Sequence, residues 1–225
     1  MFLLSSYVPL TVEIWSDLVC PWCYIGKRRF EAALERFAHR DEVSVLWRSF
    51  ELDPQAPVNP GGTSTERLAE KYGMSLEQAH AAQQQVADLA AEEGLEYRLD
   101  AARGGNTFTA HRLIHEAAVH GHQAAAKERL MAAYFTEGEP ISDPETLVRL
   151  VAEAGVDYDE AHATAFSDRH GDAVREDELL AARLGIQGVP FFVLDRRYGV
   201  SGAQPAEVLL EALERAWADL AAPAA

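Results

Sequence analysis

Two cysteines three positions apart constrain this chain more than any other feature. Cys20 and Cys23 are the only cysteines among the 225 residues, and Pro21 and Trp22 separate them. A secreted protein stabilised by disulfides carries several cysteines spread along the chain, whereas a lone close pair is more often catalytic or metal-binding. The pair leaves three interpretations: metal ligation, a structural disulfide, or reversible oxidation of the two thiols.

A metal site and a structural disulfide are the weaker interpretations. A structural zinc site takes four ligands, and the best further candidates are His111 and His115, which share a helix face but lie far from Cys23 in the sequence. A disulfide that closes so short a loop adds little stability, because the entropy removed from the denatured chain grows with loop length. We therefore predict that no metal is bound and that the pair cycles between dithiol and disulfide.

The sequence around the pair predicts a strand, a helix and a second strand. Residues 11–15 are rich in β-branched and aromatic side chains, Pro21 suits the first position of a helix, and residues 43–50 alternate in polarity. Cys20 then caps the helix, where free backbone N–H groups and the helix dipole favour the thiolate that attacks a disulfide. Cys23, one turn into the helix, is placed to resolve the resulting mixed disulfide.

A long segment rich in Ala, Glu, Gln and Leu predicts helices and little strand. It follows a loop at 53–62 that contains three prolines and paired glycines. Helices are expected at 64–73, 75–93, 107–120, 122–137, 143–154, 158–168 and 172–184, a hairpin of strands at 191–194 and 198–200, and a last helix from Pro205 to about 220. This order predicts an α/β fold in which the strands before and after the helical segment share one sheet with helices on both faces.

The sequence Gly-Val-Pro-Phe-Phe at 188–192 leads into the predicted strand at 191–194. Proline cannot donate to a sheet ladder, so a proline at a strand start is ordinarily an edge residue. Beside a Cys-x-x-Cys unit, a cis Val189–Pro190 bond that faces the cysteines becomes the favoured interpretation.

Charge and hydropathy exclude some partners. The formal net charge is −16, and an acidic surface repels phosphate backbones and anionic lipid, so neither nucleic acid nor membrane is an expected partner. The first ten residues are apolar but lack a basic region and a cleavage site, so we predict no signal peptide, and residues 221–225 are expected to fray. The default compartment is a reducing cytoplasm.

Further motifs accompany the cysteine pair. Glu-Ile-Trp-Ser-Asp at 13–17 precedes it, Asn-Thr and Ala-His-Arg-Leu lie within 106–113, and Ser-Gly-Ala-Gln-Pro follows at 201–205. Together with 188–192 they resemble the DsbA family, and within it the cytoplasmic FrnE-like branch. The resemblance covers nearly the whole chain and implies a thioredoxin fold interrupted by an inserted all-helical domain. Residues 9–60 and 171–222 would form the thioredoxin-like domain and residues 61–170 the insertion.

The resemblance also implies a thiol–disulfide oxidoreductase or isomerase that acts on protein thiols and disulfides. Cys20 would be the nucleophile, Cys23 the resolving thiol and Pro190 the cis-proline beside them. No bound cofactor is implied, and glutathione is a candidate redox partner. The expected substrate-binding residues are Trp22, Val189, His111 and Asn106, although a helix cap would also explain Asn106 and a satisfied core position His111.

The chain departs from periplasmic DsbA proteins in two respects. Its central dipeptide is Pro-Trp rather than Pro-His, and aligning Glu13 with their buried acid needs a one-residue gap, so Glu13 is either a proton acceptor or an edge carboxylate facing water.

Two other functions remain open. One is a glutathione-dependent isomerase or transferase of the kappa-like class, which typically carries serine in place of Cys20. The other is a redox-regulated, chaperone-like binding module whose helical lid grips unfolded chains.

Overall fold

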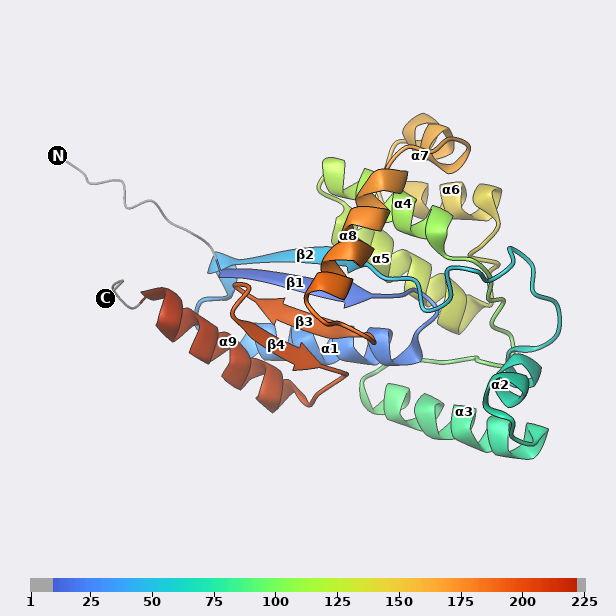
Figure 1. Ribbon diagram of the computed structural model, residues 1–225, viewed down its shortest axis with the longest axis horizontal. Coiled ribbons are helices and arrows are strands. Elements are labelled where there is room, and N and C mark those ends of the chain that lie inside the picture. Colours follow the sequence, from blue (N-terminus) through green and yellow to red (C-terminus); the bar gives the residue numbers. More distant parts are fainter. Residues whose placement is uncertain (1–9, 222–225) are drawn as a thin grey trace.

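The computed structural model describes residues 10–221 (Figure 1), so the predictions about a signal peptide and about the last four residues lie outside the described residues. The strands are β1 (Leu10–Ser16), β2 (Val43–Ser49), β3 (Phe191–Leu194) and β4 (Tyr198–Ser201). The helices are α1 (Pro21–Arg36), α2 (Ser64–Tyr72), α3 (Leu76–Glu92), α4 (Phe108–Val119), α5 (Gln123–Ala132), α6 (Pro144–Glu153), α7 (Tyr158–Ala165), α8 (Gly171–Arg183) and α9 (Ala206–Ala221). This element order confirms the predicted α/β, thioredoxin-like fold class.

The sheet has the strand order β2-β1-β3-β4 and joins the two ends of the chain. β1 runs parallel to β2 and antiparallel to β3, so Ile14 pairs with Trp47 on one side and with Phe192 on the other. β3 and β4 form the predicted hairpin, and Asp195 and Arg196 in its turn have φ angles of 49° and 53°. Two consecutive left-handed residues give the turn a twist that matches antiparallel strands.

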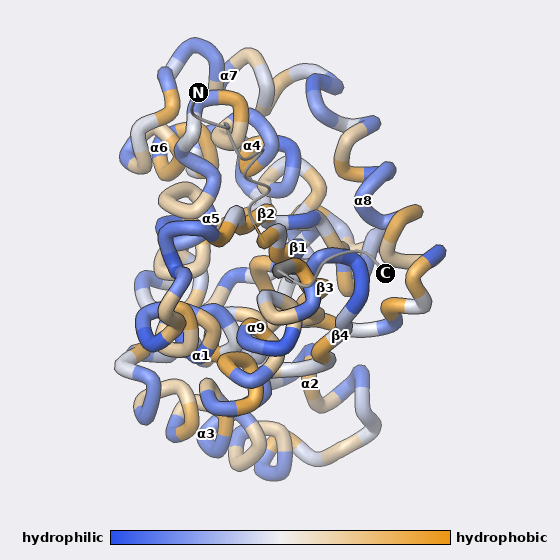
Figure 2. Tube along the Cα trace, turned by 90° about the vertical axis from the view of Figure 1, so that its left-hand side faces the viewer, coloured by the Kyte–Doolittle hydropathy of each residue, from blue (hydrophilic) through white to orange (hydrophobic). Residues whose placement is uncertain are grey.

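Helices cover both faces of the sheet (Figure 1). On one face Val12 and Ile14 pack against α1 and α9, and on the other Trp15 packs against α8. This division follows from the two-residue period of a strand, because successive side chains point to opposite faces. Hydrophobic and hydrophilic residues alternate around the turns of peripheral helices such as α3 and α8 (Figure 2). None of the helices within residues 10–221 combines the length and apolar character needed to cross a membrane.

An all-helical stretch, α2 to α7, separates β2 from α8 and packs directly against the start of α1. In Figure 1 the pair α2–α3 and the group α4–α7 lie on either side of the carboxyl end of β1. One core joins Leu18, Tyr24 and Ile25 to the buried faces of α4–α7. The ring of Tyr97 stacks on Tyr24 and on Phe135, with centroids 6.2 and 4.5 Å apart. The first turn of α1 is therefore held by the helical stretch as well as by the sheet.

One predicted helix, 122–137, is not continuous. α5 ends at Ala132, and Ala133–Glu137 forms a π-helical turn that Gly138 closes with φ 73°. The Phe135 carbonyl accepts the N–H of Arg98 at 2.7 Å. Because this partner lies on a distant segment, the last turn is set by tertiary contacts rather than by helix propensity.

Glu116 of α4 is the buried centre of a polar cluster that ties α4 to α7 and to the start of α8. Its side chain is only 4% exposed, accepts the Thr164 hydroxyl at 2.9 Å, and lies 3.0 Å from His120 and 2.8 Å from His170. Burial opposes ionisation of this carboxyl group, but the three partners outweigh it and lower the pKa of Glu116 to about 2.

Glu116→Gln is expected to lower the free energy of unfolding by about 3 kcal/mol at pH 7, since each unit of the pKa shift from 4.5 to about 2 corresponds to about 1.4 kcal/mol. An acid with a lowered folded pKa stabilises fully above its unfolded value of 4.5, and this contribution fades as the pH falls towards 2. Urea unfolding at pH 7 and pH 3 measures the difference, with the more exposed Glu160→Gln as control. A loss that is the same at both pH values would contradict the charge-based explanation.

Candidate active site

The two cysteines lie where β1 gives way to α1. Cys20 is the N-cap of α1, Pro21 is the first helical residue, and the Cys23 N–H closes the first turn on the Cys20 carbonyl at 3.0 Å. Both are free thiols and both are buried. The Cys20 sulfur is near enough to Cys23 to help raise the pKa of the inner thiol.

The segment before β3 completes the site from the other end of the chain. The Val189–Pro190 peptide bond is cis, and the Cys20 thiol donates to the Val189 carbonyl at 3.5 Å. A Cβ atom on Gly26 would lie 2.8 Å from Cγ of Pro190, so glycine at this position of α1 lets the proline approach closely. The structure thus brings Cys20, Val189 and Pro190 into one place.

Asp17 and His111 form a buried pair beneath the cysteines. His111 Nε2 lies 3.2 Å from Asp17 Oδ1, and the carboxylate also accepts the N–H groups of Leu18 at 2.7 Å and Leu52 at 2.8 Å. Burial opposes ionisation of Asp17, but the hydrogen bond and charge of His111 and the Leu52 N–H outweigh it and hold the pKa of Asp17 below its usual value. Burial lowers the pKa of His111 in spite of Asp17. Both pKa shifts favour the ionised form of Asp17 beneath the cysteines and oppose a second buried proton on His111.

Lys127 of α5 is a second buried charge, only 1% exposed. Its ammonium group donates to the Ser16 carbonyl at 3.2 Å, and no carboxylate of residues 10–221 forms an ion pair with it. Burial lowers the pKa of Lys127 to about 8, although the negative charges of Cys23, Asp17 and Cys20 act in the opposite direction. A buried ammonium without a carboxylate partner is costly, so its position close to the two sulfurs suggests a role in their chemistry.

Both burial and the charge of Lys127 shift the pKa of the Cys23 thiol. Burial, followed by the adjacent Cys20 sulfur, raises the pKa of Cys23 well above its usual value. The positive charge of Lys127 and the backbone N–H of Asp17 lower it, and they are the groups that would stabilise a Cys23 thiolate. The inner thiol is therefore a poor nucleophile except where these groups support its ionised form.

Cys20 borders a cleft of about 490 Å³. One wall is the segment Val19–Trp22 with Gly188 and Val189, and the other is made by α2, α3 and the turn that contains Tyr134. The indole of Trp22 is 40% exposed at its rim, as expected for a residue next to a helix cap. The cleft gives a substrate access to the outer cysteine.

Three other sequence candidates lie outside the cleft lining. The amide group of Asn106 donates to Glu51 and to the Pro54 carbonyl, both at 3.3 Å, and its oxygen accepts the Phe108 N–H at 3.0 Å. His111 is buried against Asp17. Glu13 does not face water: it is buried and paired with Arg48 at 2.5 Å and Arg196 at 2.9 Å, because strands β2 and β3 flank its own strand. Burial opposes its ionisation, but these two guanidinium groups lower the pKa of Glu13.

The histidines considered as metal ligands diverge. His111 contacts Asp17, whereas His115 lies 3.1 Å from Asp177. Within the part of the chain that the structure describes, no three histidine, cysteine or carboxylate side chains converge as a metal site.

Two residues of the site escaped the sequence analysis. Tyr97 donates its hydroxyl to the Pro21 carbonyl at 2.7 Å and so holds the first turn of α1. Lys127 lies in a segment of strong helix formers and resembles an ordinary surface lysine. The one available signal was its spacing from Leu130 and Met131, which places it on a buried helix face.

Known proteins share this architecture. The crystal structure of a probable DsbA oxidoreductase, SCO1869 from Streptomyces coelicolor, is 47% identical, with a TM-score of 0.91 and coverage of 96% of this chain and 93% of that one. The cytosolic disulfide reductase DsbM from Pseudomonas aeruginosa, solved with GSH, shares the fold at 21% identity and a TM-score of 0.63, over 93% and 100% of the two chains. The uncharacterized protein YwbO of Bacillus subtilis is 28% identical over 196 residues, which are 81% of this chain and 86% of that protein. Residues 11–214 match the DSBA-like thioredoxin domain family, and the chain belongs to this family.

Proposed function

We propose that this protein is a thiol–disulfide oxidoreductase that acts on disulfides in protein substrates through Cys20 and Cys23. The observation that carries the proposal is a free cysteine pair at the start of a helix, with the outer cysteine against the Val189 carbonyl and beside an apolar cleft. A thiol at a helix N-terminus next to an accessible cleft can meet a substrate sulfur, while the inner thiol stays shielded from solvent.

In the reducing direction the reaction has two exchange steps. The Cys20 thiolate attacks one sulfur of the substrate disulfide, that S–S bond breaks, and the departing thiolate takes up a proton. The Cys23 thiolate then attacks the Cys20 sulfur and releases the second substrate thiolate. The substrate gains two electrons, the protein holds a Cys20–Cys23 disulfide, and an external thiol such as glutathione, the candidate redox partner, returns it to the dithiol form.

The backbone at Val189 supports a polypeptide substrate. Among residues 10–221 its N–H has no hydrogen-bond partner, and its carbonyl is engaged only by the Cys20 thiol. A free N–H and C=O beside the nucleophile can pair with an extended peptide in the manner of strand addition. Trp22, at the cleft rim, would contact the same segment.

Finer features of the proposal follow the sequence motifs. We place the chain in the FrnE-like branch and in the cytoplasm, with residues 9–60 and 171–222 as the thioredoxin-like domain and 61–170 as the inserted helical domain. Because one core joins the helical stretch to Leu18 and Tyr24, this insertion would unfold together with the rest of the chain. A single unfolding transition seen by both far-UV circular dichroism and tryptophan fluorescence would support this coupling between the two domains.

Two experiments test the function. Insulin reduction with a thiol as electron donor measures the activity, and titration of the Cys20–Cys23 disulfide against glutathione measures its reduction potential. If the protein failed to reduce insulin yet joined glutathione to a small electrophile, it would be a glutathione-dependent transferase instead. If a variant without both cysteines kept its cellular role, the chaperone-like alternative would replace the enzymatic one.

A further inference from the structure

The charged side chains that line the cleft beside Cys20 are all positive. The charged residues that line it are Arg67 and Lys71, both cations and both on α2, while most of the remaining lining is apolar. No carboxylate lines it, although acidic residues outnumber basic ones by 36 to 20 in the chain. The local charge of the cleft is therefore opposite to that of the protein as a whole.

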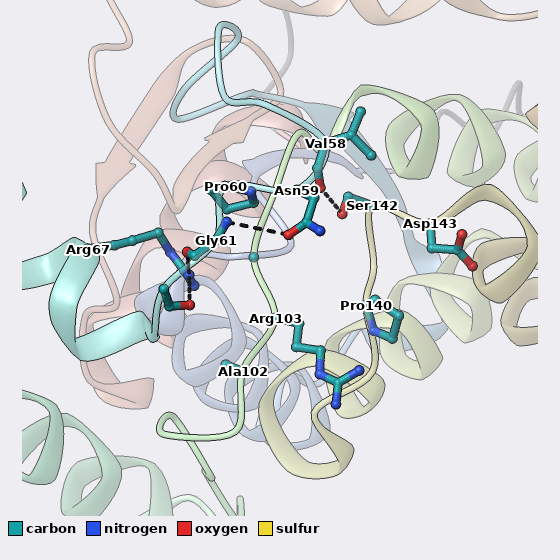
Figure 3. Close-up of a pocket in the computed structure, with 12 residues that line it drawn as sticks. Val58, Asn59, Pro60, Gly61, Arg67, Ala102, Arg103, Pro140, Ser142 and Asp143 are labelled. Carbon is teal, nitrogen blue, oxygen red and sulfur yellow. Dashed lines mark hydrogen bonds between the residues drawn. The ribbon is translucent and has the colours of Figure 1, made fainter.

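Within residues 10–221 neither cation forms an ion pair with a carboxylate. Arg67 uses one guanidinium nitrogen to donate to the carbonyls of Gly61 at 2.9 Å and Gly62 at 2.8 Å, and Figure 3 shows its side chain held against this loop. The neighbouring Glu66 accepts the N–H of Thr63 at 2.7 Å in the helix cap, and its carboxylate feels the charge of Arg67 without forming an ion pair with it. Lys71 is exposed and lies over the ring of Tyr72 at 5.8 Å. Arg67 is thus held against the loop by two hydrogen bonds, whereas Lys71 is exposed to solvent.

The rim of the cleft favours an occupant longer than a small thiol. Three large apolar side chains stand exposed on different elements around it: Trp22 by 40%, Leu52 by 41% and Tyr72 by 62%. Clustered exposed apolar side chains beside a cleft mark a surface that binds another molecule. A ligand that touches all three must extend from the cysteine to α2, as a stretch of polypeptide does.

We propose that Arg67 and Lys71 make this cleft select extended peptide segments that carry a carboxylate near the reacting cysteine. The proposal rests on the disulfide chemistry assigned above to Cys20. It makes Lys71 a specificity residue that acts on substrate charge and leaves the chemistry at the sulfurs unchanged.

The test uses three peptides of equal length, each with one cysteine joined by a disulfide to neutral thiopyridine and flanked by glutamates, glutamines or lysines. Attack by Cys20 forms a mixed disulfide with the peptide and releases thiopyridone, so single-turnover absorbance gives the rate of the first step. Lys71→Glu is compared with Arg40→Glu, an equal change in net charge at an exposed residue that precedes β2, at the far end of that strand.

At low salt we expect the wild type to react faster with the acidic than with the neutral peptide, against the bias of its net negative charge. Lys71→Glu should lower the acidic-to-neutral rate ratio by about three- to tenfold, as expected for one exposed charge reversed, and should favour the lysine peptide. Arg40→Glu should leave the ratio unchanged.

A wild-type ratio at or below one, or equal effects of the two variants, would overturn the proposal while leaving the disulfide chemistry intact. No reaction with any peptide would instead overturn the proposed function. The thiopyridine disulfide of glutathione serves as a fourth probe. If it alone responded to Lys71→Glu, the occupant would be a small anionic thiol and the peptide proposal would fail.

Discussion

Cys20→Ser is expected to abolish insulin reduction, with a loss of at least about a thousandfold, because the outer thiol is the only one that borders the cleft. Cys23→Ser keeps that nucleophile but loses the thiol that resolves the mixed disulfide, so it should accumulate covalent adducts with substrate. Non-reducing gel electrophoresis after incubation with oxidised insulin measures the adducts, and the insulin assay measures turnover.

The comparison of the two variants also assigns their roles. Both replace a buried sulfur by a hydroxyl group of similar shape, so each serves as the control for the other's effect on stability. Adducts that form with Cys20→Ser and not with Cys23→Ser would reverse the assignment of nucleophile and resolving thiol.

Lys127→Met is expected to slow the resolving step by about tenfold for each unit by which the pKa of Cys23 rises when the positive charge is removed. The charge favours the reduced, thiolate-bearing form, so its loss should also make the reduction potential more negative, by about 30 mV for a tenfold change in equilibrium. The decay of a preformed mixed disulfide as a function of pH measures the rate, and its midpoint should move to higher pH.

The stability of Lys127→Met separates the electrostatic role from a purely structural one. Removal of a buried ammonium that lacks a carboxylate partner relieves a desolvation cost, so on the electrostatic role Lys127→Met should be no less stable than the wild type. A base whose folded pKa is lowered, here to about 8 from 10.5, makes stability rise with pH between those values, and this rise should vanish in the variant. Leu130→Ala, a cavity in the same helix, should cost stability without moving the pH profile of resolution. If Leu130→Ala also slowed the resolving step and moved its midpoint to higher pH, the electrostatic role of Lys127 would be contradicted.

The sequence predicted those parts of the site whose causes are local. Proline at the helix start, the alternation in 43–50 and the glycine and proline punctuation of the loops each act within a few residues, so the strand, helix and strand around Cys20 were all found. Trp22 is 40% exposed for a local reason too, because a large ring beside a helix cap is hard to bury.

The buried charges had no such local cause. Asp17 meets His111 across a long stretch of chain, and nothing in either segment specifies the other. Lys127 is buried because α5 packs on the end of β1, whereas lysine is ordinarily exposed. The π turn after α5 likewise depends on Arg98, which belongs to another segment. In each case the deciding contact was tertiary.

The placement of β3 has a consequence for the growing chain on the ribosome. β1, both cysteines and the whole helical stretch are synthesised before β3, which completes the sheet on the open side of β1 and brings Val189 against Cys20. Pairing of such distant segments gives the fold a high contact order, and folds of this kind form slowly. Until the last strands emerge, a nascent chain carries a reactive dithiol without its covering wall and a strand with a free edge. The newly made protein is thus itself a target for the kind of disulfide exchange that we propose for the folded protein.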